Sequence, residues 1–156
     1  MADTTFTPPA GAFTRSVPIR FSHSDPAGIV YFPHYFNMFN GLIEDWYGEE
    51  LGVDYSKLIL SAGSGFPIVH AECDFRVPSR MGERLELTLL VERVGRSSLG
   101  FVIVGHLGGV ERLRARIVTA MIALATGAST PLPDDLRAAV EAYRRRTGAE
   151  PSVAKR

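Results

Sequence analysis

The chain has 156 residues, of which 46% are hydrophobic, so it is long enough for one domain with a real core and too short for two full domains. Lysine plus arginine and aspartate plus glutamate number 17 each, and this balance disfavours nucleic acid or an anionic membrane surface as a partner. The single cysteine, Cys73, excludes an intramolecular disulfide, and no group of Cys and His has the spacing of a metal site.

The two ends of the chain differ in composition from the part between them. Met1 to Ala12 has neither a basic start nor an apolar centre, so we expect a mobile tail at residues 1–12 rather than a secretory signal. No run of 18 apolar residues suggests a membrane-spanning helix. We therefore expect a cytoplasmic protein with one domain at residues 13–146 and a second mobile tail at residues 147–156.

The first half of the domain shows a strand pattern followed by a helical one. Alternation from Val17 to Ser22 predicts a strand. A long helix is predicted from Pro33 to about Glu50, and Gly52 marks its end. We also expect a short helix from Tyr55 to Ser61 and a flexible loop at residues 62–65. The strand should place Val17, Ile19 and Phe21 on one face, and the long helix should form an apolar stripe from Phe36, Phe39, Ile43, Trp46 and Tyr47.

In the second half the apolar period changes to two, which is typical of a sheet. The predicted strands run from Pro67 to Val77, Leu85 to Val91, Leu99 to Leu107 and about Val110 to Ala125. The first of them should be half-buried, with Val69, Ala71, Cys73, Phe75 and Val77 facing the core. A final helix is expected from Pro133 to Arg146, because acidic residues open it and three arginines close it.

This order predicts an α+β fold in which one long helix is wrapped by a five-stranded antiparallel sheet, with an added C-terminal helix. The last four strands are expected to form a meander. A five-stranded sheet leaves edge strands, so two copies can pair edge to edge. We expect a homodimer or a homotetramer.

A lone carboxylate stands out at the start of the domain. Asp25 comes just before a Pro26-Ala27-Gly28 turn and shortly before the proline that suits the first position of the long helix. The N-terminus of a helix carries unpaired N–H groups and a partial positive charge, which favour developing negative charge. This pairing suits chemistry on an acyl group. The alternative is that Asp25 only caps the turn.

Asp25 to Val30, followed by an aromatic pair, a proline and Tyr35, resembles the signature of hotdog-fold acyl-CoA thioesterases of the 4-hydroxybenzoyl-CoA thioesterase family. The resemblance extends from Phe13 to Leu124 and implies the hotdog fold. It also implies that Asp25 attacks the thioester carbonyl or activates water, and that the backbone N–H at Phe32 stabilises the oxyanion. No metal or cofactor is implied, since coenzyme A is part of the substrate.

Further residues are candidates for substrate binding. Tyr31 and Tyr35 are expected to line an acyl pocket, unless they belong to the core, and His34 lies in the first turn of the helix. In the resembling enzymes the turn before the strand at residues 99–107 holds the nucleotide end of coenzyme A. Arg93, Arg96 and Ser97 have suitable chemistry for its phosphates, although both arginines are equally consistent with surface charges.

The predicted function is hydrolysis of an acyl-CoA to the free acid and coenzyme A. The resemblance suggests an aromatic acyl group such as 4-hydroxybenzoyl, while the same motif also serves short aliphatic substrates. Two alternatives remain open. A hotdog enoyl-CoA hydratase or dehydratase would need His34 or His23 as its acid or base. A non-catalytic acyl-CoA binding module would need Asp25 only as a turn cap.

Overall fold

The computed structural model describes residues 4–148, so the predicted C-terminal tail beyond residue 148 lies outside the described residues. No helix in this range is long and apolar enough to cross a membrane. In chain order the elements are β1 Phe13–Pro18, the 3-10 turn η1 Phe21–His23, α1 Pro33–Asp45, the π-helical turn η2 Trp46–Glu50, α2 Tyr55–Leu60, β2 Ser64–Gly65, β3 Ile68–Phe75, β4 Arg84–Val94, β5 Ser98–Leu107, β6 Val110–Ala120, β7 Ile122–Ala123 and α3 Asp134–Thr147.

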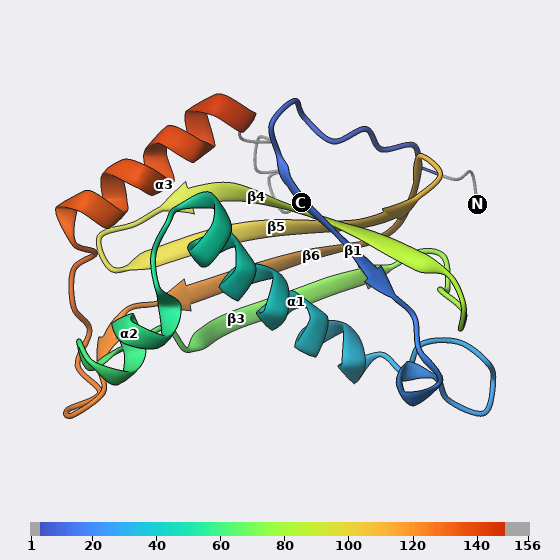
Figure 1. Cartoon of the computed structure of the whole chain (residues 1–156), viewed down its shortest axis with the longest axis horizontal. Helices are drawn as coiled ribbons and strands as arrows, with labels where there is room; N and C mark the ends of the chain where they lie inside the picture. Colours follow the sequence, from blue (N-terminus) through green and yellow to red (C-terminus); the bar gives the residue numbers. More distant parts are fainter. Residues whose placement is uncertain (1–3, 149–156) are drawn as a thin grey trace, which may run out of the picture.

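Five strands form one antiparallel sheet in the order β1-β4-β5-β6-β3, and α1 crosses one face of it (Figure 1). This arrangement is the hotdog fold, as predicted. The expected four-strand meander is wrong in one respect, because β3 pairs with β6 and only β4, β5 and β6 follow one another. The connection at residues 76–83 carries the chain from one edge of the sheet to β4, and Arg112 of β6 supports it by donating to the Pro78 carbonyl.

Several predicted boundaries are wrong for local reasons. The first strand lies earlier than expected, and Phe21 belongs to η1 with 82% of its surface exposed. Ile19 is not part of the ladder between β1 and β4, and its N–H donates to the Glu83 carbonyl. The expected flexible loop at residues 62–65 contains β2, which pairs with β7. The chain therefore breaks between β6 and β7 rather than running as one strand to Ala125.

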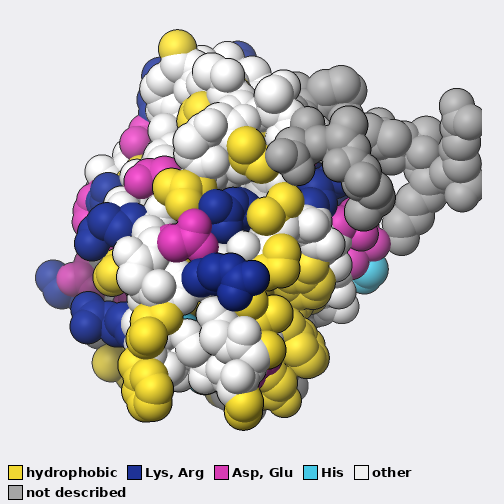
Figure 2. Space-filling model, turned by 90° about the vertical axis from the view of Figure 1, so that its right-hand side faces the viewer, with side chains coloured by type: hydrophobic (Ala, Val, Ile, Leu, Met, Phe, Trp, Pro, Cys, Tyr) yellow, Lys and Arg dark blue, Asp and Glu magenta, His cyan; other side chains and the backbone are white. Residues whose placement is uncertain are grey.

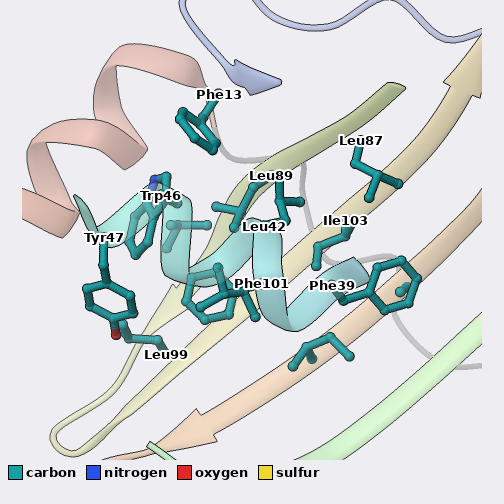
Figure 3. Packing of buried hydrophobic residues seen from close by; sticks show 14 of the residues in the cluster. Phe13, Phe39, Leu42, Trp46, Tyr47, Leu87, Leu89, Leu99, Phe101 and Ile103 are labelled. Atoms are coloured by element: carbon teal, nitrogen blue, oxygen red, sulfur yellow. The ribbon is translucent and has the colours of Figure 1, made fainter. Parts of the chain in front are cut away.

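The core lies between α1 and the inner face of the sheet. Phe39, Ile43, Trp46 and Tyr47 are buried as predicted, and Phe36 is partly buried beside them. Figure 3 shows Leu42 of α1 and Trp46 of η2 facing residues of β4 and β5 such as Leu89 and Phe101. The Trp46 ring contacts Phe101 edge to face, with centroids 5.4 Å apart. Each such buried side chain contributes about 1.5–3 kcal/mol, so this helix is firmly held on the sheet.

Strand β3 is the exception to the predicted burial pattern. Val69, Ala71 and Phe75 were expected to face the core, but all three are exposed in the single chain, Val69 with 60% of its surface. The strand pairs with β6 along one edge only. Val69 and Ala71 are consequently left at the rim of the sheet, and Phe75 meets only the first turn of α1, where Tyr35 contacts it.

The added C-terminal helix is confirmed, and it covers the part of β4 that β1 leaves unpaired. The Tyr143 hydroxyl accepts a hydrogen bond from the Phe13 N–H at 2.9 Å and donates one to the Leu89 carbonyl at 2.6 Å. Phe13 and Leu89 are the last pair of the ladder between β1 and β4. The phenol of Tyr143 therefore continues the hydrogen bonding of the sheet where its edge strand begins.

Residues 4–12 were expected to form a mobile tail, but they pack against the outer face of the sheet. The Glu111 N–H donates to the Thr4 carbonyl, and the Phe6 N–H donates to the Gly109 carbonyl. The ring of Phe6 is buried against Leu90, Val102 and Val104. One aromatic residue thus covers an apolar patch that composition alone did not reveal.

The Phe6 ring also covers His106 of β5, with centroids 5.0 Å apart. His106 is buried, and its Nε2 lies 2.9 Å from the Thr88 hydroxyl. Burial lowers the pKa of His106, and the opposing effect of Glu86, its partner across the strand pair, is smaller.

We expect His106 to make stability depend on pH. Because its pKa is lower in the folded state, the unfolded chain binds more protons as the pH falls below about 6.5, and stability is lost. His106→Gln keeps a partner for Thr88 but does not titrate. Urea unfolding at pH 7.5 and pH 5 should show a smaller loss for this variant than for the wild type. Equal losses would contradict the prediction.

Candidate active site

The loop that carries Asp25 is held closed by backbone hydrogen bonds. Ser24 and Val30 form an antiparallel bridge, and the Asp25 N–H donates to the Ile29 carbonyl at 3.0 Å. The Ala27 N–H donates to Asp25 Oδ1 at 2.8 Å. The expected turn cap is therefore present. Only one carboxylate oxygen takes part in it, because Oδ2 of Asp25 has no hydrogen-bond partner among residues 4–148.

The N-terminus of α1 follows this loop directly in the chain. The Tyr31 N–H donates to the His23 carbonyl at 2.9 Å, and this bond ties the start of the helix to η1. The N–H groups of His34 and Tyr35 already bond to the carbonyls of Tyr31 and Phe32, and Pro33 has no N–H. The N–H of Phe32, the residue predicted to stabilise an oxyanion, has no hydrogen-bond partner within the described part of the chain. It is a donor at the positive end of a long helix.

Two histidines lie side by side at the same place. The rings of His23 and His34 are 5.9 Å apart, and His34 also contacts Tyr31. Nδ1 of His23 accepts a hydrogen bond from the Arg20 N–H, so the neutral ring carries its proton on Nε2. Burial, and then the neighbouring His34 and Arg20, lower the pKa of His23. Both rings thus flank the Asp25 loop.

An apolar pocket of about 240 Å³ opens between the start of α1 and the end of β3. The rings of Phe32 and Phe75 meet edge to face with centroids 6.3 Å apart, and Tyr35 contacts Phe75 at 5.6 Å. Its walls are formed by Ile29, Val30, Phe32, Tyr35, Phe75, Arg76, Val77 and Pro78. Tyr35 and Phe32 therefore do lie together in a pocket, whereas Tyr31 is half-exposed beside it and does not line it.

Figure 2 views the end of the molecule that carries this loop and shows hydrophobic side chains gathered over the lower part of that face. Phe21, Tyr31, Phe32 and Met81 are the large exposed apolar residues of the surrounding loops, and Phe75 extends this surface to β3. The sequence did not single out Phe75, because its alternation assigned it to the core. A large aromatic residue near the end of an edge strand was the available signal.

The residues predicted to bind nucleotide phosphates lie elsewhere. Arg93 and Arg96 are exposed and Ser97 is partly exposed at the turn between β4 and β5. That turn and the Asp25 loop are at opposite ends of the sheet (Figure 1). Strand β4 alone spans about 30 Å from Arg84 to Arg93 at the usual rise of a strand. Within one chain these residues are not brought together with Asp25.

Arg93 instead lines a larger cavity of about 440 Å³ on the outer face of the sheet. His70 and Glu72 of β3 and the ion pair of Glu92 with Arg116 contribute its charged lining. Neither Arg93 nor Arg96 forms an ion pair with any residue from 4 to 148. In the same range no group of three or more His, Cys, Asp or Glu is arranged to hold a metal ion.

A long helix wrapped by a five-stranded antiparallel sheet, with an added C-terminal helix, is the hotdog fold of the thioesterases. The sequence profile of the thioesterase-like superfamily matches residues 19–140, and the chain belongs to this superfamily.

Curated relatives agree with this assignment. The 1,4-dihydroxy-2-naphthoyl-CoA hydrolase of Nostoc punctiforme is 28% identical over 86% of this chain and 90% of its own length. The hydrolase of the same name from Rippkaea orientalis is 31% identical over 80% and 90%.

Solved structures show the same architecture. A thioesterase superfamily protein from Jannaschia sp. CCS1 superposes with a TM-score of 0.80 at 27% identity, covering 90% of this chain and 98% of that one. A 1,4-dihydroxy-2-naphthoyl-CoA thioesterase from Synechocystis gives a TM-score of 0.73 at 28% identity, with coverage of 83% and 96%.

The conformation of the Asp25 loop depends on Gly28, which has a φ of 76° and donates its N–H to the Asp25 carbonyl. Gly28→Ala places a side chain in the left-handed region and should cost about 1–2 kcal/mol of stability. It should also lower thioester hydrolysis by about tenfold or more, because a small displacement of a reacting group costs up to roughly 100-fold.

Gly127→Ala is the matched control for this prediction. Gly127 has a φ of 72° in the turn after β7, and an added Cβ would meet no atom within 4 Å, as at Gly28. Thermal unfolding should show similar losses for the two variants, while only Gly28→Ala loses activity. If both variants retain full activity, the loop conformation does not matter for the reaction.

Proposed function

We propose that the protein hydrolyses an aromatic acyl-CoA to the free acid and coenzyme A, with Asp25 as nucleophile or general base. The observation that carries the proposal is the meeting of three features at the start of α1. These are a carboxylate oxygen of Asp25 and a backbone N–H of Phe32, neither with a partner among residues 4–148, and an apolar pocket with aromatic walls.

These groups suffice for thioester hydrolysis. If Asp25 is the nucleophile, its carboxylate attacks the carbonyl carbon, coenzyme A leaves as the thiolate, and water then hydrolyses the anhydride. If Asp25 is the base, it takes a proton from the water that attacks the same carbon. In both cases the carbonyl oxygen becomes negative, and the Phe32 N–H stabilises it by about 3 kcal/mol. A thiolate leaves without strong assistance from an acid, so His23 and His34 need not protonate it.

The pocket supports an aromatic acyl group. Its volume of about 240 Å³ and its edge-to-face rings suit a flat ring better than a flexible chain. Relatives named for 1,4-dihydroxy-2-naphthoyl-CoA support the same class of substrate. Tyr35 contributes to the wall of this pocket, and His34 lies in the same first turn of α1. 4-Hydroxybenzoyl-CoA, the substrate of the resembling family, remains one candidate within this class.

We further propose that the working unit is at least a homodimer formed along β3. The free edge of β3 and its exposed Val69 and Phe75 suit antiparallel pairing with a second copy. Such pairing reverses the second sheet, so the β4–β5 turn of the partner lies at the same end as the Asp25 loop. Coenzyme A phosphates could then reach Arg93, Arg96 and Ser97 of one copy while the acyl group occupies the pocket of the other.

The role of Asp25 is tested by Asp25→Asn, which keeps the size of the side chain and its hydrogen bond to the Ala27 N–H. Release of coenzyme A thiol from 1,4-dihydroxy-2-naphthoyl-CoA and 4-hydroxybenzoyl-CoA should fall by about 100- to 10,000-fold. Asp54→Asn is the matched control, because Asp54 caps the start of α2 in the same way. Unchanged activity of Asp25→Asn would mean that the carboxylate only caps its turn.

Product analysis separates hydrolysis from the two alternatives. Free acid and free thiol in equal amounts support a hydrolase. A hydrated acyl-CoA with an intact thioester would identify a hydratase, and tight binding without turnover would identify a binding module.

Pairing through β3 is tested by Val69→Glu, because a charge on an apolar edge strand opposes association. Sedimentation should give at least twice the mass of the 17.1 kDa chain for the wild type and the monomer mass for the variant, with loss of activity. Leu60→Glu on α2 is a control at an exposed apolar position away from β3. A monomeric wild type with full activity would refute the proposed dimer.

A further inference from the structure

The turn η1, which precedes the Asp25 loop, is held by hydrogen bonds rather than by packing. None of its residues is buried, and 82% of the Phe21 surface is exposed. Nδ1 of His23 accepts from the Arg20 N–H at 3.0 Å, while the His23 N–H donates to the Arg20 carbonyl at 3.0 Å. Among residues 4–148 the Arg20 N–H has no other acceptor. The side chain and the backbone of one histidine thus close this turn together.

The same histidine is connected to both groups of the candidate site. Its carbonyl accepts the Tyr31 N–H at 2.9 Å, directly before Phe32, whose N–H is the proposed oxyanion donor. In the other direction Asp25 follows His23 by two residues, and Ser24 between them belongs to the bridge that closes the loop. A shift of His23 therefore moves the carboxylate and the oxyanion donor relative to each other.

The hydrogen bond from Arg20 requires a neutral His23 ring. A ring nitrogen accepts only while it is unprotonated, and in an imidazolium both nitrogens carry protons. After protonation two donors would face each other at Nδ1, so the turn must open or the ring must rotate away. Since η1 has no buried residue, little packing opposes this movement. The ring is only partly buried, so water can deliver the proton directly.

The surroundings of the ring determine when it is protonated. Its titratable and charged neighbours are Arg20 on the same turn, His34 on α1, Tyr31, Asp25 and, on the connection at residues 76–83, Glu83. Among residues 4–148 no carboxylate forms an ion pair with this ring. Burial, then His34 and Arg20, lower the pKa of His23 below its usual value of 6.5. The ring is consequently neutral at pH 7.5 and becomes charged only on acidification.

We propose that His23 is a positioning residue whose neutral ring holds η1, and that its protonation opens this turn, displaces Asp25 relative to the Phe32 N–H and reduces hydrolysis. This inference rests on the proposed function. Asp25 and Phe32 supply the reacting groups, while His23 acts through the backbone that joins them. The loss is reversible, because only a proton from water is gained and no other bond changes.

The test follows kcat/KM for 1,4-dihydroxy-2-naphthoyl-CoA between about pH 8 and about pH 5. The wild type should lose about tenfold on an acid limb with a midpoint below about 6.5. His23→Asn puts an amide oxygen in the position of Nδ1 and does not titrate, so this limb should disappear. His23→Leu has no acceptor and should be impaired by a similar factor across the whole range. Rescue by asparagine but not by leucine separates the hydrogen bond from simple filling of space.

Two further histidine variants sharpen the assignment. His34→Asn removes a neighbouring ring that buries and repels the protonated form of His23, so the midpoint of the limb should move to higher pH. His106→Gln is the matched control, because His106 also has a lowered pKa but lies on the outer face of the sheet. Its acid limb should equal that of the wild type. Circular dichroism at each pH verifies that the chain is folded.

An acid limb that persists unchanged in His23→Asn would overturn the inference. So would an NMR titration in which the Arg20 amide resonance fails to follow the His23 ring. In both cases the proposed hydrolase activity still stands. If the folded wild type releases no thiol from any aromatic thioester at any pH, the proposed function itself fails, and the inference that depends on it fails too.

Discussion

The packing of α1 against the inner face of the sheet holds every other part of the fold in its place. Phe39, Leu42 and Trp46 are almost completely buried against β4 and β5 (Figure 3). Because the helix cannot slide along the sheet without exposing them, its first turn is fixed in space. The Asp25 loop, the N–H of Phe32 and the apolar pocket all lie at that turn. The contact that stabilises the fold therefore also positions the proposed site.

The residues of the proposed site contribute little to the stability of the fold. Phe32 and Phe75 are about half-exposed, and the Phe32 N–H lacks a partner within residues 4–148. A protein optimised only for folding would cover such rings and pair such a donor. The edge of β3 likewise contributes little to stability, because its apolar side chains Val69 and Phe75 lie outside the core. One surface therefore serves both the proposed substrate and the proposed second copy.

Supporting contacts arrive from distant parts of the chain. The connection at residues 76–83 is held by Arg112 and Glu83, and its Ser79 carbonyl accepts a hydrogen bond from the Val30 N–H next to the Asp25 loop. At the other end of the sheet, Tyr143 completes the ladder between β1 and β4. These polar contacts are few, but each satisfies groups that would otherwise be buried without partners. They hold the connection at residues 76–83 and the start of β1 in place.

Local features of this protein follow from the sequence alone. Helical spacing identified α1 and its buried stripe, alternation identified β4, β5 and β6, and the motif from Asp25 to Tyr35 identified the thioesterase superfamily and the start of the helix. The pairing of the strands does not follow from it, because the place of β3 beside β6 depends on contacts between residues far apart in the chain. For the same reason the separation of Arg93 and Arg96 from Asp25, the burial of Phe6 on the outer face and the hydrogen bond between Ser79 and Val30 are visible only in the folded chain. Periodicity reports which face a residue occupies, whereas long-range packing decides what lies opposite that face.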